Sequence, residues 1–309
     1  MLWSELCSLY GAKFVFICGR ELLIIILVIE NVRVTETGRE EMMIYGRHGA
    51  LGEAPSESLL KVFIVMYHSI GGSASDPYTV SVDNFNQQII WLVESGFQII
   101  PLRFLIQCLA DGDDSRLDRG VVITFDDGYE DFVENALPIL LHYRIAATVF
   151  LVTDLMGRTA SWSHWNRNER LMTEDEVRYI RKQGISTGSH TATHVDLTAV
   201  NPVELKGQLD KSRDKLVEFG ESFPTLSYPW GRCSGPIGRA AKESGYKCAV
   251  AVGGGTVSRG SDIYRLPRII MRGDMDFSSF RAIFNCKTSP RTVSVWRSPF
   301  RKLFPGAHQ

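Results

Sequence analysis

Short apolar runs alternate with longer segments of mixed polarity along most of this chain. The runs are rich in β-branched and aromatic residues, which favours buried strands, and the longer segments repeat apolar residues three or four positions apart, which favours amphipathic helices. Strands are expected at residues 61–67, 97–102, 121–125, 147–152, 226–228, 247–252 and 266–271, with a further short strand just before His190. Helices are expected at residues 83–96, 134–143, 173–184, 201–219 and 237–244.

Strands that alternate with helices are typical of parallel sheets, in which right-handed crossovers join successive strands. A closed or nearly closed α/β barrel would gather the carboxyl ends of these strands at one opening. Local signals agree with the helix boundaries: Thr173 and Glu176 form a capping-box sequence. Pro202 lies in the first turn of another expected helix, and Gly220 lies just past its end.

Three parts of the chain differ in pattern. Residues 59–275 hold the regular alternation and are the expected catalytic domain, and residues 276–309 lose it and are expected to form a peripheral tail. Residues 1–58 contain apolar runs at 14–18 and 22–29 that are too short for a spanning helix and lack a clear signal-peptide cleavage site. This segment is a membrane anchor, an extra element with a linker, or sequence ahead of the true start, so both an envelope and a cytoplasmic location stay open.

Composition narrows the function classes only slightly. The chain has 309 residues, a net charge of −1 and 44% hydrophobic residues, which is ordinary for a globular protein with a substantial core. The balanced charge gives no support for nucleic-acid binding, and no protein partner is indicated. Six cysteines without C-x-x-C spacing indicate neither a zinc knuckle nor a small disulfide scaffold.

Candidate chemistry appears where two expected strands end. Asp126 and Asp127 follow a β-favouring run directly, and adjacent carboxylates repel each other unless a proton or a cation separates them. His190 and His194 follow another strand, four positions apart. Imidazole nitrogens with a carboxylate oxygen are typical of a catalytic zinc with an open position for water. The sequence therefore predicts a divalent metal site, most simply for Zn²⁺, with Co²⁺ or another divalent ion as alternatives.

These motifs resemble those of a known family. Thr-Phe-Asp-Asp-Gly at 124–128, followed by Ser-His-Thr-Ala-Thr-His at 189–194, is similar to the NodB-homology polysaccharide deacetylases, carbohydrate esterase family four. Further similar segments lie at 65–70, 146–151 and 227–231, so the resemblance covers about residues 61–272. It implies a distorted (β/α) barrel with fewer than eight repeats.

The resemblance also implies roles for individual residues. Asp127, His190 and His194 would hold the metal, and Asp126 would be the general base. The turn formed by Tyr228, Pro229, Trp230 and Gly231 would line the substrate pocket, where a backbone N–H helps to hold the oxyanion. Trp162 and Trp165 lie in a polar loop, where they would either stack on sugar rings or pin the loop to the core.

Two departures from the family pattern change this assignment. Many members have an arginine two residues before the proline of the pocket turn, and this chain has Ser227 there. Arg232, Arg265 and Arg268 are the candidates to replace it, and Arg268 is preferred as the residue that orients the base.

The second departure concerns the general acid. Many members end with a Leu-x-His motif, but no histidine lies between His194 and His308. The leaving amine still needs a proton, and His68 at the end of the first expected strand could supply it. An early Tyr-His motif of this kind resembles the poly-N-acetylglucosamine deacetylases.

The expected function is therefore metal-dependent removal of N-acetyl groups from an amino-sugar polymer or its precursor, with release of acetate. The expected partner is a carbohydrate that contains N-acetylglucosamine. An O-acetyl esterase or a non-sugar amide hydrolase on the same fold is an alternative, and a catalytically silent carbohydrate-binding module is another. The presence of Asp126 argues against a catalytically silent binding module, because carbohydrate binding alone does not need a general base.

Overall fold

The computed structural model describes residues 13–19, 22–28, 61–72, 76–162 and 169–285. The chain divides into one unit from Met1 to Ser56 and a second from Glu57 to Gln309, close to the boundary expected at residue 58. The described part of the first unit is an antiparallel hairpin of β1 (Lys13–Gly19) and β2 (Leu22–Val28). The three interpretations of residues 1–58 stay predictions. Among the described residues, no helix combines the length and the apolar character needed to cross a membrane.

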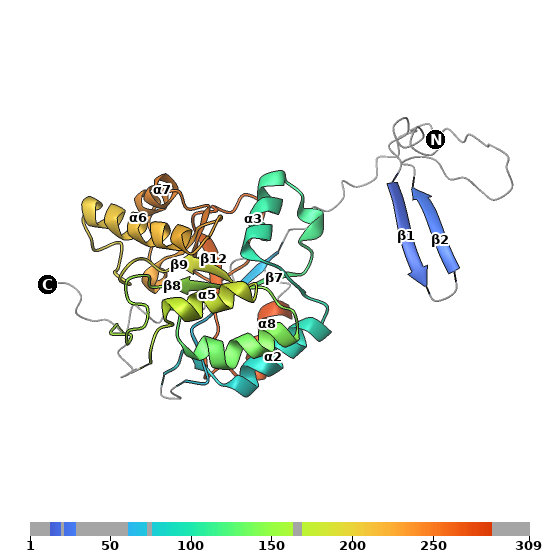
Figure 1. Ribbon diagram of the computed structural model, residues 1–309, viewed down its shortest axis with the longest axis horizontal. Helices are drawn as coiled ribbons and strands as arrows, with labels where there is room; N and C mark the ends of the chain where they lie inside the picture. Colours follow the sequence, from blue (N-terminus) through green and yellow to red (C-terminus); the bar gives the residue numbers. More distant parts are fainter. Residues whose placement is uncertain (1–12, 20–21, 29–60, 73–75, 163–168, 286–309) are drawn as a thin grey trace. The chain divides into compact units, whose positions relative to one another are not determined.

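The second unit is built around a closed barrel of seven parallel strands (Figure 1). Neighbours around the barrel are β3, β12, β11, β10, β9, β8 and β7, and pairing of β7 with β3 closes the ring. The strands are β3 (Phe63–Tyr67), β7 (Gly120–Phe125), β8 (Ala147–Leu151), β9 (Ser186–Ser189), β10 (Thr225–Ser227), β11 (Cys248–Val252) and β12 (Leu266–Ile270). The expected distorted barrel with fewer than eight repeats is confirmed.

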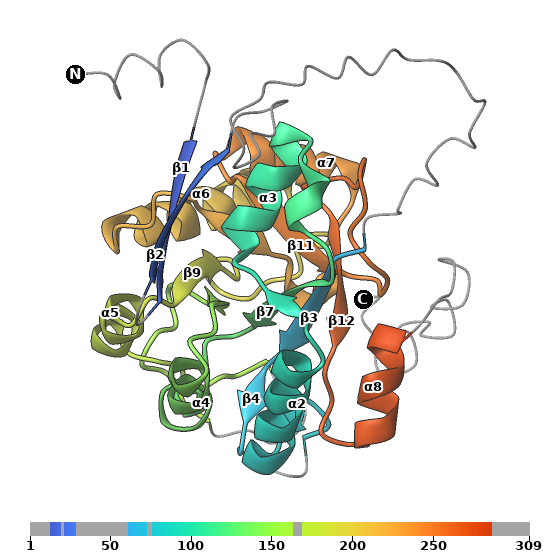
Figure 2. The same ribbon diagram turned by 90° about the vertical axis from the view of Figure 1, so that its right-hand side faces the viewer.

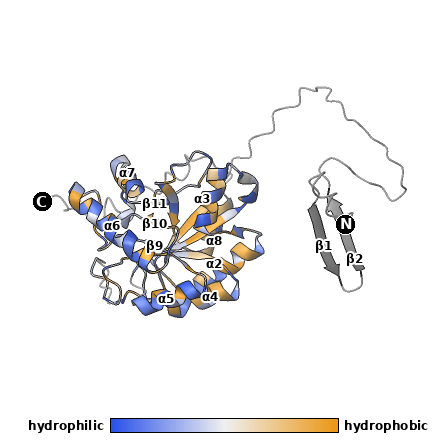
Figure 3. Cartoon of the chain, turned by 45° about the horizontal axis from the view of Figure 1, so that its top comes forward, coloured by the Kyte–Doolittle hydropathy of each residue, from blue (hydrophilic) through white to orange (hydrophobic). Residues whose placement is uncertain are grey.

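Shorter elements and helices complete this unit. The strand β6 (Gln98–Ile99) adds to the first residues of β7, and β4 (Ser69–Ile70) pairs with β5 (Thr79–Val80). The helices are α2 (Val82–Glu94), α3 (Leu102–Asp111), α4 (Leu137–His142), α5 (Glu174–Lys182), α6 (Pro202–Glu218), α7 (Gly235–Glu243) and α8 (Phe277–Asn285). Single turns lie at Asp114–Arg116, Phe132–Ala136 and Pro229–Gly231. Hydrophilic residues gather on the helices around the strands (Figure 3).

Alternation along the strands separates two layers of core. Val65, Ile123 and Val149 belong to a cluster that includes buried residues of the surrounding helices. Their neighbours Ile64, Val122 and Phe150 belong to a second cluster, which α3 joins through residues such as Leu105. Because successive side chains of a strand point to opposite faces, the first cluster lies outside the barrel and the second fills its interior.

Local capping explains where two helices begin. The Thr173 hydroxyl accepts the backbone N–H of Glu176, and the Glu176 carboxylate accepts the backbone N–H of Thr173, which is the expected capping box. For α2, the N-cap is Ser81 and not Asp83 or Asn84, because the Ser81 hydroxyl accepts the N–H of Asn84. The helix therefore begins slightly earlier than expected.

Two elements correct the sequence-based expectations. The strand expected at 97–102 ends at Ile99, and the helix α3, which was not expected, begins at Leu102 directly after Pro101. The expected peripheral tail at 276–309 begins instead with α8, which lies beside α2 (Figure 2). Phe280 of α8 is fully buried against Trp91 of α2. With nine residues, α8 is too short for its apolar positions to show a clear helical repeat in the sequence. Residues 286–309 lie outside the described residues.

The burial of Phe280 makes the stability of the barrel unit depend on α8. We expect Phe280→Ala to lower the free energy of unfolding by about 3–5 kcal/mol, because the substitution removes a buried aromatic ring and leaves a cavity. Urea denaturation followed by circular dichroism measures this loss. The control Ala282→Gln, at an exposed position of the same helix, should change stability by less than about 0.5 kcal/mol. Equal effects of the two substitutions would contradict the packing role.

Candidate active site

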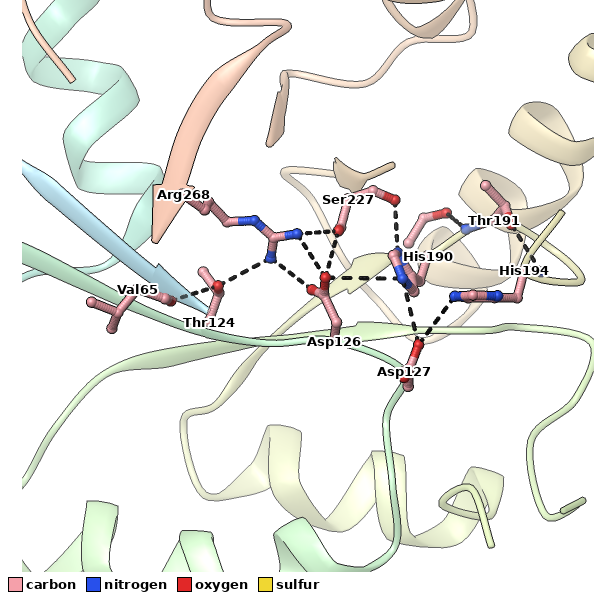
Figure 4. Close-up of polar contacts among 10 residues, drawn as sticks. Val65, Thr124, Asp126, Asp127, His190, Thr191, His194, Ser227 and Arg268 are labelled. Carbon is pink, nitrogen blue, oxygen red and sulfur yellow. Dashed lines mark hydrogen bonds and ion pairs between the residues drawn. The ribbon is translucent and has the colours of Figure 1, made fainter. Parts of the chain in front are cut away.

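The polar residues of the candidate site come from the carboxyl ends of four barrel strands (Figure 4). Asp126 and Asp127 follow β7 directly, and His190 follows β9. Ser227 is the last residue of β10, and Arg268 lies within β12. These five residues are at least 95% buried, so the site is a polar cluster inside the barrel, toward the carboxyl ends of its strands. Active sites of β/α barrels form at this end of the strands.

The Asp126 carboxylate forms a bidentate ion pair with Arg268. Arg268 Nη1 donates to Asp126 Oδ1 over 2.7 Å, and Nη2 donates to Oδ2 over 2.6 Å. The arginine is fully buried and lies over the Phe150 ring in the barrel interior. Planar guanidinium donors match a carboxylate in this geometry. Among the three arginines considered from the sequence, Arg268 is the one that contacts Asp126.

This ion pair keeps Asp126 charged despite its burial. Desolvation by itself raises the pKa of Asp126, but the charge of the Arg268 guanidinium and its hydrogen bonds to the carboxylate outweigh this effect. The pKa therefore lies below its usual range, and Asp126 is an ionised carboxylate at neutral pH.

Ser227 connects this pair to the histidine that follows β9. Its hydroxyl donates to Asp126 Oδ2 over 3.1 Å and accepts a hydrogen bond from Arg268 Nη2 over 2.7 Å. Its backbone carbonyl lies 2.8 Å from His190 Nδ1. Thr124 accepts a hydrogen bond from Arg268 Nη1 over 3.2 Å and donates to the Val65 carbonyl, which ties the guanidinium to β7 and β3.

Asp127, His190 and His194 form the candidate metal centre. Their ligand atoms lie within 4.8 Å of one another, and they are the only such group found among the described residues. Asp127 Oδ1 lies 3.5 Å from His190 Nε2 and 3.3 Å from His194 Nε2. In the described part of the chain, this buried oxygen has no donor in hydrogen-bond geometry. An acceptor oxygen aimed at two imidazole nitrogens fits a divalent cation such as Zn²⁺.

The charge states of these groups also fit a metal. Burial opposes ionisation of Asp127, but its contact with the His194 imidazole, together with the nearby His68 and His190, holds its pKa below the ordinary value. Burial lowers the pKa of His190 to about 4, although Asp126 and Asp127 act to raise it. His190 is thus neutral at neutral pH, and its Nδ1–H donates to the Ser227 carbonyl. Its Nε2 lone pair is left free to bind a metal.

Backbone strain concentrates at this centre. Asp127, Thr191 and His194 have φ values of 72°, 67° and 60°, in the left-handed region that residues other than glycine rarely adopt. Hydrogen bonds hold the turn in this conformation: the His194 N–H donates to Thr191 Oγ1, and the Ala192 N–H donates to Gln208 Oε1 from α6. Two of the three candidate ligands therefore occupy strained positions that surrounding contacts maintain.

His68, the candidate general acid, follows β3 and lies at the same opening. Its imidazole lies near enough to Asp126 and Asp127 to lower the pKa of each. Its ring packs against the Tyr78 ring with centroids 5.1 Å apart. The fold thus brings this early histidine to the acidic pair, although more than 50 residues separate them in the sequence.

The expected pocket turn enters the site only in part. Trp230 packs edge-on against the His194 ring, with centroids 4.9 Å apart and an interplanar angle of 69°. Tyr228 is wrongly predicted as a pocket residue: it is fully buried in the outer core and its hydroxyl donates to the Tyr264 carbonyl. Pro229 is also buried, and the Gly231 N–H donates to the Tyr228 carbonyl, so it is not available for an oxyanion.

Two further contributors were missed from the sequence. Ser227 was noticed only as the place of an absent arginine, but it binds both members of the ion pair. Trp162 stacks on the His194 ring, with centroids 4.3 Å apart and planes at 17°. The indole also packs against the buried cluster that contains Tyr129 and Leu171, which agrees with the expectation that the ring attaches its loop to the core. His164 and Trp165 lie outside the described residues.

Comparisons with known proteins agree with these motifs. A family model described as polysaccharide deacetylase matches residues 113–249. The chain is 31% identical over 229 residues to YxkH of Bacillus subtilis, which is assigned by its name to the polysaccharide deacetylases, and the match covers 74% of this chain and 77% of that protein. It is 28% identical over 207 residues to a Staphylococcus aureus poly-β-1,6-N-acetyl-D-glucosamine N-deacetylase, which covers 64% of this chain and 69% of that protein.

Solved structures share the fold. The Streptococcus pyogenes deacetylase PplD superimposes with a TM-score of 0.63 at 24% identity, over 74% of this chain and all of that chain. IcaB from Ammonifex degensii superimposes with a TM-score of 0.61 at 19% identity, over 72% of this chain and 95% of that chain. At these identities the structural likeness establishes the fold alone.

The buried ion pair generates a prediction about stability. We expect Arg268→Met to lower the free energy of unfolding of the metal-free protein by about 3–5 kcal/mol, because Asp126 is left buried without its partner. The double variant Asp126→Asn with Arg268→Met should regain part of that loss, as chemical denaturation of each variant would show. As a control, Arg232→Met breaks a half-exposed pair with Asp196 and should cost at most about 1 kcal/mol. Equal losses for Arg268→Met and Arg232→Met would contradict the dependence on Arg268.

Proposed function

This chain belongs to the polysaccharide deacetylase family, and from that membership we propose that it removes N-acetyl groups from an amino-sugar polymer or its precursor with the help of a divalent metal. Membership makes it an amide hydrolase of acetylated polysaccharide. The Staphylococcus aureus relative, named for poly-β-1,6-N-acetyl-D-glucosamine, supports a substrate that contains N-acetylglucosamine. Acetate and a free amine would be the products.

The observation that carries this proposal is the different environment of two adjacent carboxylates. Asp127 faces His190 and His194, whereas Asp126 faces Arg268. One carboxylate is thereby a metal ligand in our proposal, and its neighbour is an oriented base. A carbohydrate-binding module would not need an ionised, buried carboxylate beside a metal centre, because its burial costs free energy that binding does not recover.

Each residue then has a proposed role. Asp127, His190 and His194 would hold Zn²⁺, Co²⁺ or another divalent ion, which when bound supplies Lewis acidity toward the acyl oxygen and a lowered pKa of water. Asp126 accepts the proton of the attacking water, and Arg268 keeps its carboxylate in one orientation. His68 donates a proton to the leaving amine. Trp230 borders the site beside His194 and would contribute to the substrate pocket.

Metal removal and Asp126→Asn test the proposal together. We expect the full-length chain to release acetate from N-acetylglucosamine oligomers, to lose this activity after treatment with a chelator, and to regain it with Zn²⁺ or Co²⁺. Asp126→Asn should lower turnover by about 100-fold or more while it retains one metal per chain, because the base is lost and the ligands are not. Acetate assays and metal analysis measure the two properties.

A matched control and the alternatives are distinguished in the same assays. Asp210→Asn removes a carboxylate that pairs with Lys206 on α6, and it should leave turnover unchanged. Release of acetate from O-acetyl esters but not from the oligomers would contradict an N-deacetylase. Metal binding without hydrolysis of any acyl substrate would favour the silent carbohydrate-binding module.

His68 is tested separately, because its proposed role concerns only the proton given to the leaving group. We expect His68→Ala to lower turnover by about 100- to 10,000-fold with unchanged metal content. His142→Ala, which changes an exposed histidine of α4, serves as the control and should match the wild type. Full turnover of His68→Ala would remove His68 from the mechanism.

A further inference from the structure

The two histidines of the candidate metal centre are held in different ways. His190 Nδ1 donates to the Ser227 carbonyl over 2.8 Å. His194 Nδ1 is buried, and within the part of the chain that the structure describes it has no hydrogen-bond partner. Metal-binding histidines nearly always donate this second N–H to a carboxylate, a carbonyl or water, which fixes the plane of the ring. His194 therefore needs another contact to fix its ring.

Two aromatic rings contact the His194 imidazole. The Trp162 indole lies face to face with the His194 imidazole, with centroids 4.3 Å apart and planes at 17°. Trp230 meets the same ring at its edge, with centroids 4.9 Å apart and planes at 69°. Rotation of the imidazole about its χ2 torsion, which is intrinsically soft, would bring it into collision with the indole of Trp162.

The backbone just before Trp162 is held by hydrogen bonds to residues 169–171. The Ala160 N–H donates to the Glu169 carbonyl over 3.1 Å, and the Leu171 N–H donates to the Arg158 carbonyl over 2.8 Å. These bonds pair the two sides of the segment on which Trp162 lies. The indole also packs against a small buried cluster made of Tyr129, Val152, Ala160 and Leu171. Trp162 is thus attached to the fold independently of His194.

The same segment is bonded to the loop that bears Asp127. The Met172 N–H donates to the Gly128 carbonyl over 2.9 Å, and the Glu130 N–H donates to the Arg170 carbonyl over 2.9 Å. One segment therefore contacts both the carboxylate side and the His194 side of the candidate centre. Because Trp162 belongs to this segment, its indole is held in position relative to Asp127.

We propose that Trp162 is the positioning residue of His194, and that its stacked indole replaces the hydrogen bond that orients His190. This inference rests on the proposed metal site. It makes the two imidazoles unequal: His190 is oriented and polarised by a carbonyl, whereas His194 is oriented by contacts with aromatic rings, of which the stacked Trp162 covers its face. Trp162 contacts neither metal nor substrate in this role and acts only through His194.

Metal affinity of the full-length protein tests the proposal without an activity assay. We expect Trp162→Leu to weaken Zn²⁺ binding about 10- to 100-fold, the usual cost of losing an orienting contact, as measured by competition with a chromophoric chelator. Trp162→Phe keeps a stacking ring and should stay closer to the wild type. With Co²⁺ bound, Trp162→Leu should also alter the visible absorption bands, which report ligand geometry.

The control Trp91→Leu makes the same substitution in α2, where Trp91 packs against Phe97 and Phe280, and it should leave Zn²⁺ affinity unchanged. A double-variant test of whether Trp162 acts through His194 is sharper. In a His194→Ala background, Trp162→Leu should cause no further loss of affinity, because the ring that it positions is absent. Equal losses in both backgrounds would overturn the proposal, as would unchanged affinity of Trp162→Leu in the otherwise wild-type chain.

Failure of this inference differs from failure of the proposed function. If the wild type binds Zn²⁺ and hydrolyses the oligomers while Trp162→Leu binds Zn²⁺ as tightly, only the role of Trp162 is wrong. If the wild type binds no metal, both the proposed function and this inference are wrong. Trp162→Leu could also lose affinity because the variant is unfolded, and thermal unfolding of the metal-free variant tests this. A loss of affinity that results from unfolding would count against the positioning role.

Discussion

Two adjacent carboxylates buried at one strand end impose the main physical constraint on this protein. Asp126 and Asp127 are both almost fully buried. Two adjacent carboxylates repel each other strongly when water is excluded. The fold resolves the conflict by separating the two environments. A buried guanidinium compensates Asp126, and two imidazoles face Asp127, where we propose that a divalent cation binds. Most of the polar interior of the barrel serves this separation.

Small polar residues on neighbouring strands make the separation rigid. Ser227 and Thr124 are short enough to leave room for the Arg268 side chain, and both bond to it. The Ser227 carbonyl also orients His190, so β10 links the proposed base to the proposed metal ligands. A large side chain at position 227 would occupy the space that the guanidinium from β12 now fills.

The parts of the site that the sequence predicts well are those that depend on short segments. Asp126, Asp127 and His190 directly follow strands whose apolar pattern is clear, so the rule for strand ends locates them together. Arg268 lies 142 positions from Asp126, and three arginines met the chemical requirement, so only the register of β12 distinguishes them. Tyr228 was misplaced because adjacent residues of an extended segment face opposite sides. The Trp162 stack depends on the path of an irregular segment, which no periodicity reveals.

Arg268 belongs to β12, the last barrel strand along the chain, which pairs with β11 and with β3 from the opposite end of the domain. A ribosome therefore makes Asp126 long before it makes the arginine that compensates its charge. Until β12 emerges, Asp126 has no compensating guanidinium, and no strand joins β11 to β3. Charge neutralisation and topological closure thus become a single late event in biosynthesis. A fragment cut at residue 249, where the match to the family model ends, would contain the recognisable motifs without the group that makes their burial tolerable.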